Sequence, residues 1–310
     1  MKRICLFVLT GILFVSCENK VISAPGMYAL ELNSADDLKV LLKEDRYPLI
    51  SSHRGGDAEG FPENCIETFE RAAALGPAII ETDIAMTKDS VLVLMHDDRL
   101  DRTSTGKGFV RDYNYSEIKS FFLKDFRGRE TAYKIPTLDE ALIWGKHKVV
   151  YTLDVKRRVP YEKVVESIRK NAAEPYSIAI TYSADQARAF HKLAPDIWLS
   201  VSANGPEDIQ RLKKYKVSTD RIVAFVGITE PSRQTIDYMN TQQIPMILGT
   251  MGNLDKSAKM NGDHLYYTFF EKGIRILSAD RNRAAAGQAL KFARDRELTS
   301  EFIKNNKKAH

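Results

Sequence analysis

The sequence predicts an α/β fold in which parallel strands close into a (β/α)8, or TIM, barrel, and three observations predict it. Eight short apolar runs alternate with stretches of helical periodicity. At 310 residues, the chain is long enough for one such barrel with a large core. Polar residues suited to catalysis follow several of the runs, which is where a barrel places its site. The predicted strands span 49–53, 78–84, 149–154, 177–181, 197–201, 222–226, 244–248 and 274–278.

Helical patterns fill the gaps between these strands. Apolar residues recur at helical spacing from Ala184 to Leu193 and from Glu207 to Tyr215. A shorter pattern at Ser34–Lys43 predicts a helix ahead of the first strand. The expected organisation is therefore a tether and lead-in helix over 17–45, one barrel over 46–298 and a solvated basic tail over 299–310.

The second predicted strand belongs to a β-hairpin. Apolar, β-branched residues fill 78–87 and 91–96, and the three residues between them are polar. Side chains alternate faces along a strand, so Glu81 and Asp83 point the same way. With the turn centred between Lys88 and Asp89, the numbers of paired residues add to about 177, and His96 lies opposite Glu81.

The acids of this hairpin are hard oxygen donors that suit Ca²⁺ or Mg²⁺. An isolated pair such as Glu81 and Asp83 is often just two solvent-facing acids on an edge strand. The neighbouring Ile79, Ile80 and Ile84 indicate a buried strand, where unpaired charges are costly. This context favours a metal site.

The segment after the first strand carries His53, Arg54 and two glycines. An imidazole there is often a packed or capping side chain, but the planar arginine beside it matches phosphate oxygens. Further along, Asn64 and Glu67 have the spacing of a helix capping box, which makes Asn64 structural. Glu63 is either a first-turn acid favoured by the helix dipole or a group near the metal.

Another apolar run ends in Asp154-Val155-Lys156. The two charged residues share a face of the predicted strand. They are either a surface pair or, at the rim of a barrel, a third metal ligand and a phosphate-facing ammonium.

Together these motifs resemble the glycerophosphodiester phosphodiesterase family. They follow one another across residues 50–156 in the family's order, and 279–281 resembles a late family motif. The matching segments are His53-Arg54-Gly55, Pro62-Glu63-Asn64, Glu81-Thr82-Asp83, His96-Asp97, Leu100-Asp101-Arg102-Thr103, Ile135-Pro136-Thr137-Leu138 and Asp154-Val155-Lys156.

The resemblance implies a distorted TIM barrel with a small insertion, about 97–146, after the hairpin of the second strand. It implies hydrolysis of glycerophosphodiesters to glycerol 3-phosphate and an alcohol, with a neighbouring glycerol hydroxyl as the nucleophile. The implied roles are Ca²⁺ or Mg²⁺ on Glu81, Asp83 and Asp154, acid–base catalysis by His53 and His96, and phosphate binding by Arg54 and Lys156.

The chain departs from the family pattern at two places. The family usually has Glu where Asp154 stands, although the related sphingomyelinase D enzymes look similar with Asp there. The family's late Trp-Thr-Val-Asn is replaced by Gly249-Thr250-Met251-Gly252, which bears on the substrate pocket rather than on the chemistry.

Several other functions compete with this interpretation. The alternatives are a barrel that binds a phospho-ligand without turnover, one that stops at a cyclic phosphate, and one that acts on lysophospholipids or glycerol-phosphate polymers. A glycoside hydrolase needs carboxyl groups about 5 to 9.5 Å apart across a bond, which neighbouring Glu81 and Asp83 do not suit. An amidohydrolase would want two histidines on the first strand, where this chain has His53-Arg54-Gly55.

The first seventeen residues have the pattern of an export signal. Lys2 and Arg3 precede about a dozen mostly apolar residues, too few for a membrane span, so residues 1–16 are predicted to be a signal peptide. Ser16-Cys17 resembles the lipidation site of bacterial lipoproteins. That resemblance implies an exported protein, periplasmic or anchored to the outer membrane through Cys17; the alternative is a secreted protein with Cys17 free.

Composition restricts the partners. The formal net charge of +5 would fall to +3 without Lys2 and Arg3, which does not indicate nucleic acid binding. Cys65 is expected to be a small core residue, so no disulfide is expected. We therefore expect a small phosphodiester as substrate, membrane contact only through the anchor, no nucleic acid and no obligate protein partner.

Overall fold

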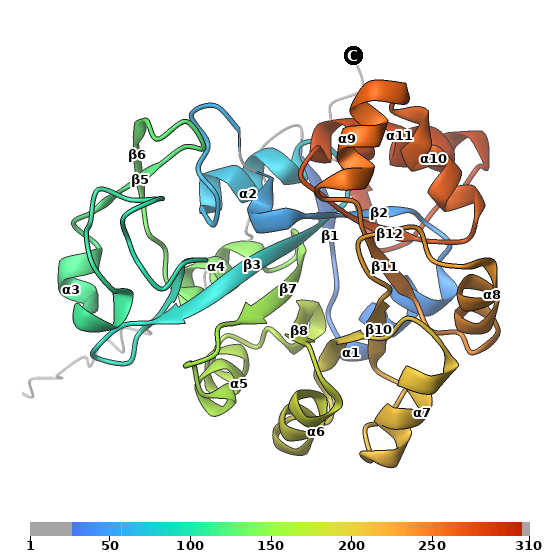
Figure 1. Ribbon diagram of the computed structural model, residues 1–310, viewed down its shortest axis with the longest axis horizontal. Coiled ribbons are helices and arrows are strands. Elements are labelled where there is room, and N and C mark those ends of the chain that lie inside the picture. The colour runs from blue at the N-terminus through green and yellow to red at the C-terminus, as the bar shows by residue number, and fades with distance from the viewer. Residues whose placement is uncertain (1–26, 57, 306–310) are drawn as a thin grey trace, which may run out of the picture.

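The computed structural model describes residues 27–56 and 58–305, and in it eight parallel strands close into a barrel (Figure 1). The ring closes because β2 pairs with both β12 and β3. The TIM barrel predicted from the sequence is thus confirmed, with strand limits within two residues of those expected. In order around the ring, the strands are β2 (Leu49–Ser52), β3 (Ala78–Met86), β7 (Val150–Val155), β8 (Ser177–Thr181), β9 (Trp198–Ser202), β10 (Ile222–Phe225), β11 (Met246–Gly249) and β12 (Ile276–Ala279).

Helices surround the ring and cover its strands, which is why the strands read as nearly continuous apolar runs (Figure 1). Helix α6 has the predicted limits, and α7 begins and ends one residue before its predicted limits. Two short 3₁₀ turns, η2 (His53–Gly55) and η4 (Glu174–Tyr176), complete the connections. The helices are α2 (Ile66–Ala73), α4 (Leu138–Gly145), α5 (Tyr161–Lys170), α6 (Ala184–Leu193), α7 (Pro206–Lys214), α8 (Arg233–Thr241), α9 (Asn253–Asn261), α10 (His264–Glu271) and α11 (Asn282–Asp295).

The insertion follows β4 (Leu92–Leu94), which pairs antiparallel with β3. It forms a lobe beside the barrel with a small core of its own, which includes Cys65 (Figure 1). Helix α4 contacts β4 and α5 as an ordinary barrel helix, so the lobe ends near residue 136, before the expected limit of 146. Within the lobe lie η3 (Val110–Asp112), α3 (Tyr115–Ile118), β5 (Phe122–Lys124) and β6 (Glu130–Lys134).

The described ends of the chain pair with each other. Strand β1 (Tyr28–Leu30) runs antiparallel to β13 (Ile303–Asn305), so these residues are neither a free tether nor a solvated tail. The Leu30 amide donates to the Lys148 carbonyl just before β7, which places this ribbon at the barrel end opposite the strand C-termini. The expected lead-in helix is α1 (Ala35–Lys39), continued by a π-helical turn, η1 (Val40–Glu44).

The predicted signal peptide, 1–16, and Cys17 lie outside the described residues. Within the residues that are described, none of the helices has the length and apolar character to cross a membrane.

Candidate active site

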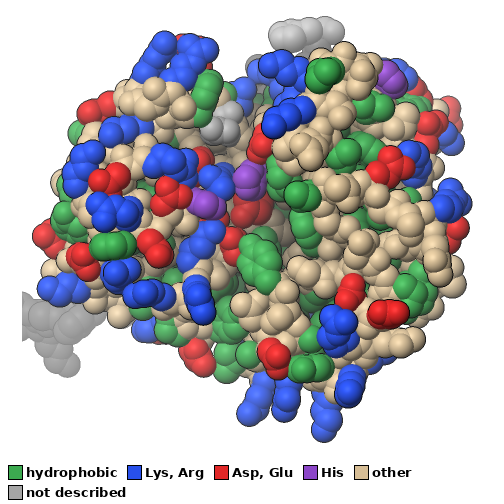
Figure 2. Space-filling model, in the orientation of Figure 1, with side chains coloured by type: hydrophobic (Ala, Val, Ile, Leu, Met, Phe, Trp, Pro, Cys, Tyr) green, Lys and Arg blue, Asp and Glu red, His purple; other side chains and the backbone are tan. Residues whose placement is uncertain are grey.

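A cavity of about 190 Å³ opens at the C-terminal ends of the barrel strands. Figure 2 shows histidine and acidic side chains gathered in a hollow near the middle of this face. The cavity brings together five of the residues for which the sequence predicts a site: His53, Glu81, Asp83, His96 and Asp154. It is also lined by Ser51, Thr152, Ile180, Thr181, Tyr182, Ser200, Ser202, Phe225, Ile247, Met251 and Ser278.

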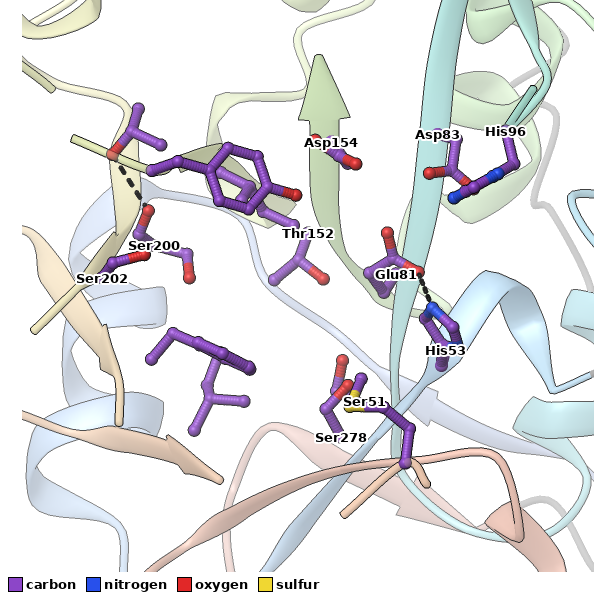
Figure 3. Close-up of a pocket in the computed structure, with 16 residues that line it drawn as sticks. Ser51, His53, Glu81, Asp83, His96, Thr152, Asp154, Ser200, Ser202 and Ser278 are labelled. Carbon is purple, nitrogen blue, oxygen red and sulfur yellow. Dashed lines mark hydrogen bonds and ion pairs between the residues drawn. The ribbon is translucent and has the colours of Figure 1, made fainter. Parts of the chain in front are cut away.

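Three carboxylates form the acidic side of the cavity (Figure 3). Glu81 and Asp83 project from β3 on one face, and Asp154 on β7 is the register partner of Asp83. One oxygen from each carboxylate lies within 4.8 Å of the others. The shorter Asp154 therefore still reaches the other two acids, and the three could hold a metal ion.

The electrostatics of the three acids fit a divalent cation. All three are buried, and burial followed by the charge of Asp83 raises the pKa of Glu81 to about 8. Burial also opposes ionisation of Asp83, but Lys156 and Asn64 outweigh it and hold the pKa of Asp83 below its usual value. The site thus gathers hard carboxylate oxygens whose mutual repulsion a cation would relieve, and these are the donors that Ca²⁺ and Mg²⁺ prefer.

Both predicted phosphate-binding cations lie against these acids. Lys156 Nζ is 2.5 Å from Asp83 Oδ1 and 2.7 Å from Asp154 Oδ2. Arg54 has a left-handed backbone, with φ of 52°, and its amide donates to Glu81 Oε2 at 2.8 Å. The guanidinium turns toward the same acids, with Nε 3.7 Å from Asp83 Oδ2.

The imidazoles of His53 and His96 are each hydrogen-bonded to an aspartate. His53 Nδ1 is 2.7 Å from Asp280 Oδ1, and His96 Nδ1 is 2.6 Å from Asp97 Oδ1. A carboxylate only accepts, so Nδ1 carries the proton in both rings and Nε2 is left for proton transfer. Burial disfavours the His53 imidazolium, but Asp280 and Glu81 outweigh it and raise the pKa of His53.

The predicted register of the hairpin is wrong by one residue. Ile84 pairs with Leu94, and Thr87 and Val91 bond across a three-residue loop centred on Asp89. The left-handed conformation of Ser90, with φ of 65°, allows this longer loop, which moves the centre of the turn. His96 consequently does not face Glu81 across the ladder; it lies beyond the end of β4 and reaches the cavity from a bend.

The predicted capping box at Asn64 is also wrong. The residue that caps α2 is Cys65, and Asn64 has a left-handed backbone with φ of 56°. Its side chain instead binds β3: Nδ2 donates to Asp83 Oδ2 at 2.7 Å, and Oδ1 accepts from the Asp83 amide at 3.0 Å. Glu63 lies nearby, bonded to Arg54 Nη1 at 3.2 Å and outside the group of three clustered acids.

Three residues at the site received no role from the sequence. Asp97 stood in the His-Asp motif and Asp280 followed the last strand, but neither position alone indicates which imidazole it would meet. Tyr182 lies at the cavity wall. The usable signal was position: Tyr182 and Asp280 stand just after barrel strands, and Asp97 follows the hairpin strand β4.

Comparison with known proteins decides the family. A sequence profile of the glycerophosphoryl diester phosphodiesterase family matches residues 53–240, which include both imidazoles and all three clustered acids. The chain belongs to this family.

Individual members of the glycerophosphoryl diester phosphodiesterase family agree. A glycerophosphodiester phosphodiesterase of Caldanaerobacter subterraneus is 34% identical over 48% of this chain and 64% of its own. This chain covers about three-fifths of the length of this relative and of two other curated relatives that it matches. A glycerophosphoryl diester phosphodiesterase structure from Parabacteroides distasonis is 33% identical, with a TM-score of 0.82 over 90% of this chain and 100% of that one.

A more distant structure shares the fold. An Oleispira antarctica phosphodiesterase, solved with the product sn-glycerol-3-phosphate, has a TM-score of 0.63 at 18% identity and covers 84% of this chain and 100% of that one.

The structure also accounts for the departure from the family pattern at 249–252. A Cβ at Gly249 would lie 2.8 Å from Met251 Sδ and 2.9 Å from Phe225 Cζ, so a larger residue here would require these side chains to move. Met251 and Phe225 line the cavity in its place. Apolar side chains therefore form part of the cavity wall at this departure from the family pattern.

Proposed function

We propose that this protein hydrolyses glycerophosphodiesters to glycerol 3-phosphate and an alcohol, in a reaction that requires a divalent cation. The observation that carries the proposal is the convergence of three clustered carboxylates and two aspartate-supported imidazoles on one cavity. Family membership and the product bound to the Oleispira antarctica phosphodiesterase support the same reaction.

Glu81, Asp83 and Asp154 are proposed to hold the cation, Ca²⁺ or Mg²⁺. When bound, it would offset the negative charge of the diester and so make phosphorus easier to attack. Arg54 and Lys156 lie beside the same acids and would bind the remaining phosphoryl oxygens, the arginine with its planar fork and the lysine as a point charge.

The two histidines are proposed to move the protons. One neutral imidazole takes, at Nε2, the proton of the glycerol hydroxyl that attacks phosphorus, and the other, protonated, delivers one to the oxygen of the leaving alcohol. Water then opens the resulting cyclic phosphate to give glycerol 3-phosphate. Asp280 and Asp97 hold the two rings with Nδ1 protonated, which leaves Nε2 of each ring for proton transfer. General acid–base help of this kind is worth about 10² to 10⁴ in rate.

Phosphorus NMR of glycerophosphocholine turnover tests the proposal. We expect glycerol 3-phosphate to form with Mg²⁺ or Ca²⁺ present and not with excess chelator. His53→Ala and His96→Ala should each lower kcat by about 10²-fold or more while calorimetric cation binding persists. Glu81→Ala should weaken that binding, and near-normal turnover by either histidine variant would refute its assigned role.

The same assay separates the competing functions. A lyase-like reaction would leave a cyclic phosphate as the final signal, and a non-catalytic binding barrel would leave every diester intact. Running lysophospholipids and glycerol-phosphate polymers beside glycerophosphocholine, each with and without cation, identifies the preferred alcohol.

We also propose that the protein is exported and anchored through Cys17. The support is the sequence of residues 1–17 alone. Metabolic labelling with a fatty acid should mark the wild type and not Cys17→Ala, and labelling of neither would favour the secreted alternative.

A further inference from the structure

The guanidinium of Arg102 lies between two carboxylates at the rim of the cavity. Arg102 Nε and Nη2 donate to Asp97 at 2.7 and 3.0 Å. Its Nη2 and Nη1 also donate to Glu63 at 2.8 and 2.9 Å. Arg102 belongs to the insertion, whereas Glu63 belongs to the loop between β2 and α2, so this bridge spans two parts of the fold.

The first carboxylate of the bridge supports an imidazole. Asp97 accepts from His96 Nδ1 with Oδ1 while Arg102 occupies both of its oxygens. Hydrogen bonds from Arg102 hold the pKa of Asp97 well below its usual range, so this carboxylate stays charged. The position of the Asp97 oxygens, and with it the orientation of the His96 ring, therefore depends on Arg102.

The second carboxylate supports the arginine of the site. Both oxygens of Glu63 lie 3.2 Å from Arg54 Nη1, and both also accept from Arg102. Glu63 is buried, so its charge needs cationic partners. Without Arg102, Glu63 would draw more strongly on Arg54, whose Nε faces Asp83.

We propose that Arg102 is a positioning residue that orients His96 through Asp97 and Arg54 through Glu63. The inference rests on the proposed function for its effect on rate, but its effect on the two side chains is independent of any substrate. It also gives the insertion a part in the reaction, because the insertion supplies a guanidinium that links an acid–base group to a phosphate-binding group through their two carboxylate partners.

The competing interpretation is that Arg102 only fastens the insertion to the barrel. Other contacts already do so: Arg129 Nη1 is 2.5 Å from Glu59, and the Gly60 amide donates to Asp125 at 3.0 Å. Arg129→Gln is therefore a matched control, because it removes an ion pair between the same two segments without touching Asp97 or Glu63. Lysine at 102 cannot form two forked pairs at once, so Arg102→Lys tests the geometry rather than the charge.

The test combines kinetics with nitrogen NMR of the histidines in the full chain. In cation-loaded Arg102→Gln and Arg102→Lys, we expect kcat on glycerophosphocholine to fall about 10- to 100-fold with KM changed much less. The His96 signals, assigned with His96→Gln, should shift from one Nδ1-protonated tautomer toward a mixture. Arg129→Gln should keep both the rate and the tautomer, and millimolar guanidinium should restore part of the activity of Arg102→Ala.

Two results would overturn the proposal. One is an unchanged His96 tautomer with an unchanged kcat in Arg102→Gln. The other is an equal loss in Arg129→Gln, which would reduce Arg102 to a fastening role. Absence of turnover in the wild type would instead refute the proposed function, and the NMR comparison would still decide whether Arg102 orients His96.

Discussion

At the scale of single residues, the two imidazoles differ in where their aspartates come from. Asp97 is the next residue after His96 in the sequence. Asp280 is far from His53 in the sequence and comes close to it only because β12 pairs with β2. The Asp280 backbone amide is itself held by Asp255 at 2.9 Å. His53 is therefore oriented by the closure of the barrel.

Asp280→Asn tests this orientation. Removing the charge should lower kcat by about 10²-fold, because the His53 imidazolium loses its partner. Since Asp280 raises the pKa of His53, the limb of the pH–rate profile that belongs to His53 should move to lower pH. Asp263→Asn is the control, because Asp263 pairs with Arg281, the residue that follows Asp280, and not with His53. A pH profile identical to that of the wild type would contradict the assignment.

Glu81 predicts a pH dependence of stability in the cation-free protein. Its pKa is about 8 in the folded protein and near 4.5 in the unfolded chain. Between these values the folded state binds more protons, so the free energy of unfolding contributed by Glu81 falls as pH rises. With chelator present, the midpoint temperature of unfolding should decrease as the pH is raised from 5 to 8. The increase in this midpoint on adding cation should become larger over the same pH range.

The control for this linkage is Glu81→Gln, which cannot titrate. Its stability should vary less with pH across that window, and added cation should raise its midpoint less. An equal cation-induced rise at pH 5 and pH 8 in the wild type would count against a proton on Glu81.

At the scale of elements, the β2–α2 loop carries the support for Asp83. Asn64 accepts from the Asp83 amide and from Thr82 Oγ1, and it donates to the Asp83 carboxylate. Asparagine tolerates the left-handed backbone at this position better than most residues. One loop residue thus fixes the middle of β3, where two of the three clustered acids stand.

Asn64→Ala should be clearly destabilising. It leaves the buried Asp83 amide unpaired and places alanine in a left-handed conformation, which together cost about 2 to 4 kcal/mol. Asn64→Gly loses the same hydrogen bonds without the backbone strain, so urea unfolding should give it an intermediate free energy. Both variants should bind cation more weakly; an Asn64→Ala protein as stable as the wild type would exclude this support.

The same elements show what the sequence could and could not predict. Alternation along β3 was enough to place Glu81 and Asp83 on one face, because that pattern is local. The hairpin register depended on the conformation of Ser90, and the cap of α2 depended on that of Asn64. Both are backbone conformations that depend on tertiary contacts, so residue spacing alone predicted the wrong hairpin register and the wrong helix cap.

At the scale of the whole molecule, the eight strands were predictable because each is buried on both faces and therefore reads as an apolar run. The contacts that support the site were not, since Asp280 meets His53 and Arg102 meets Glu63 only across separate elements. Only the closed barrel and the docked insertion bring them together.

The ribbon formed by β1 and β13 closes the barrel end that lies away from the site. Phe302 is buried there, and Ser300 Oγ bonds to Asp45 before the first barrel strand. Deleting residues 300–310 should therefore lower the free energy of unfolding by about 2 to 4 kcal/mol, from the lost phenylalanine burial and strand pairing. Because this end of the barrel is remote from the cavity, kcat at a temperature where the variant stays folded should be unchanged. Deleting only 306–310, which leaves β13 intact, should change neither quantity, and a fall in kcat for the longer deletion while folded would show that the two ends of the barrel are coupled.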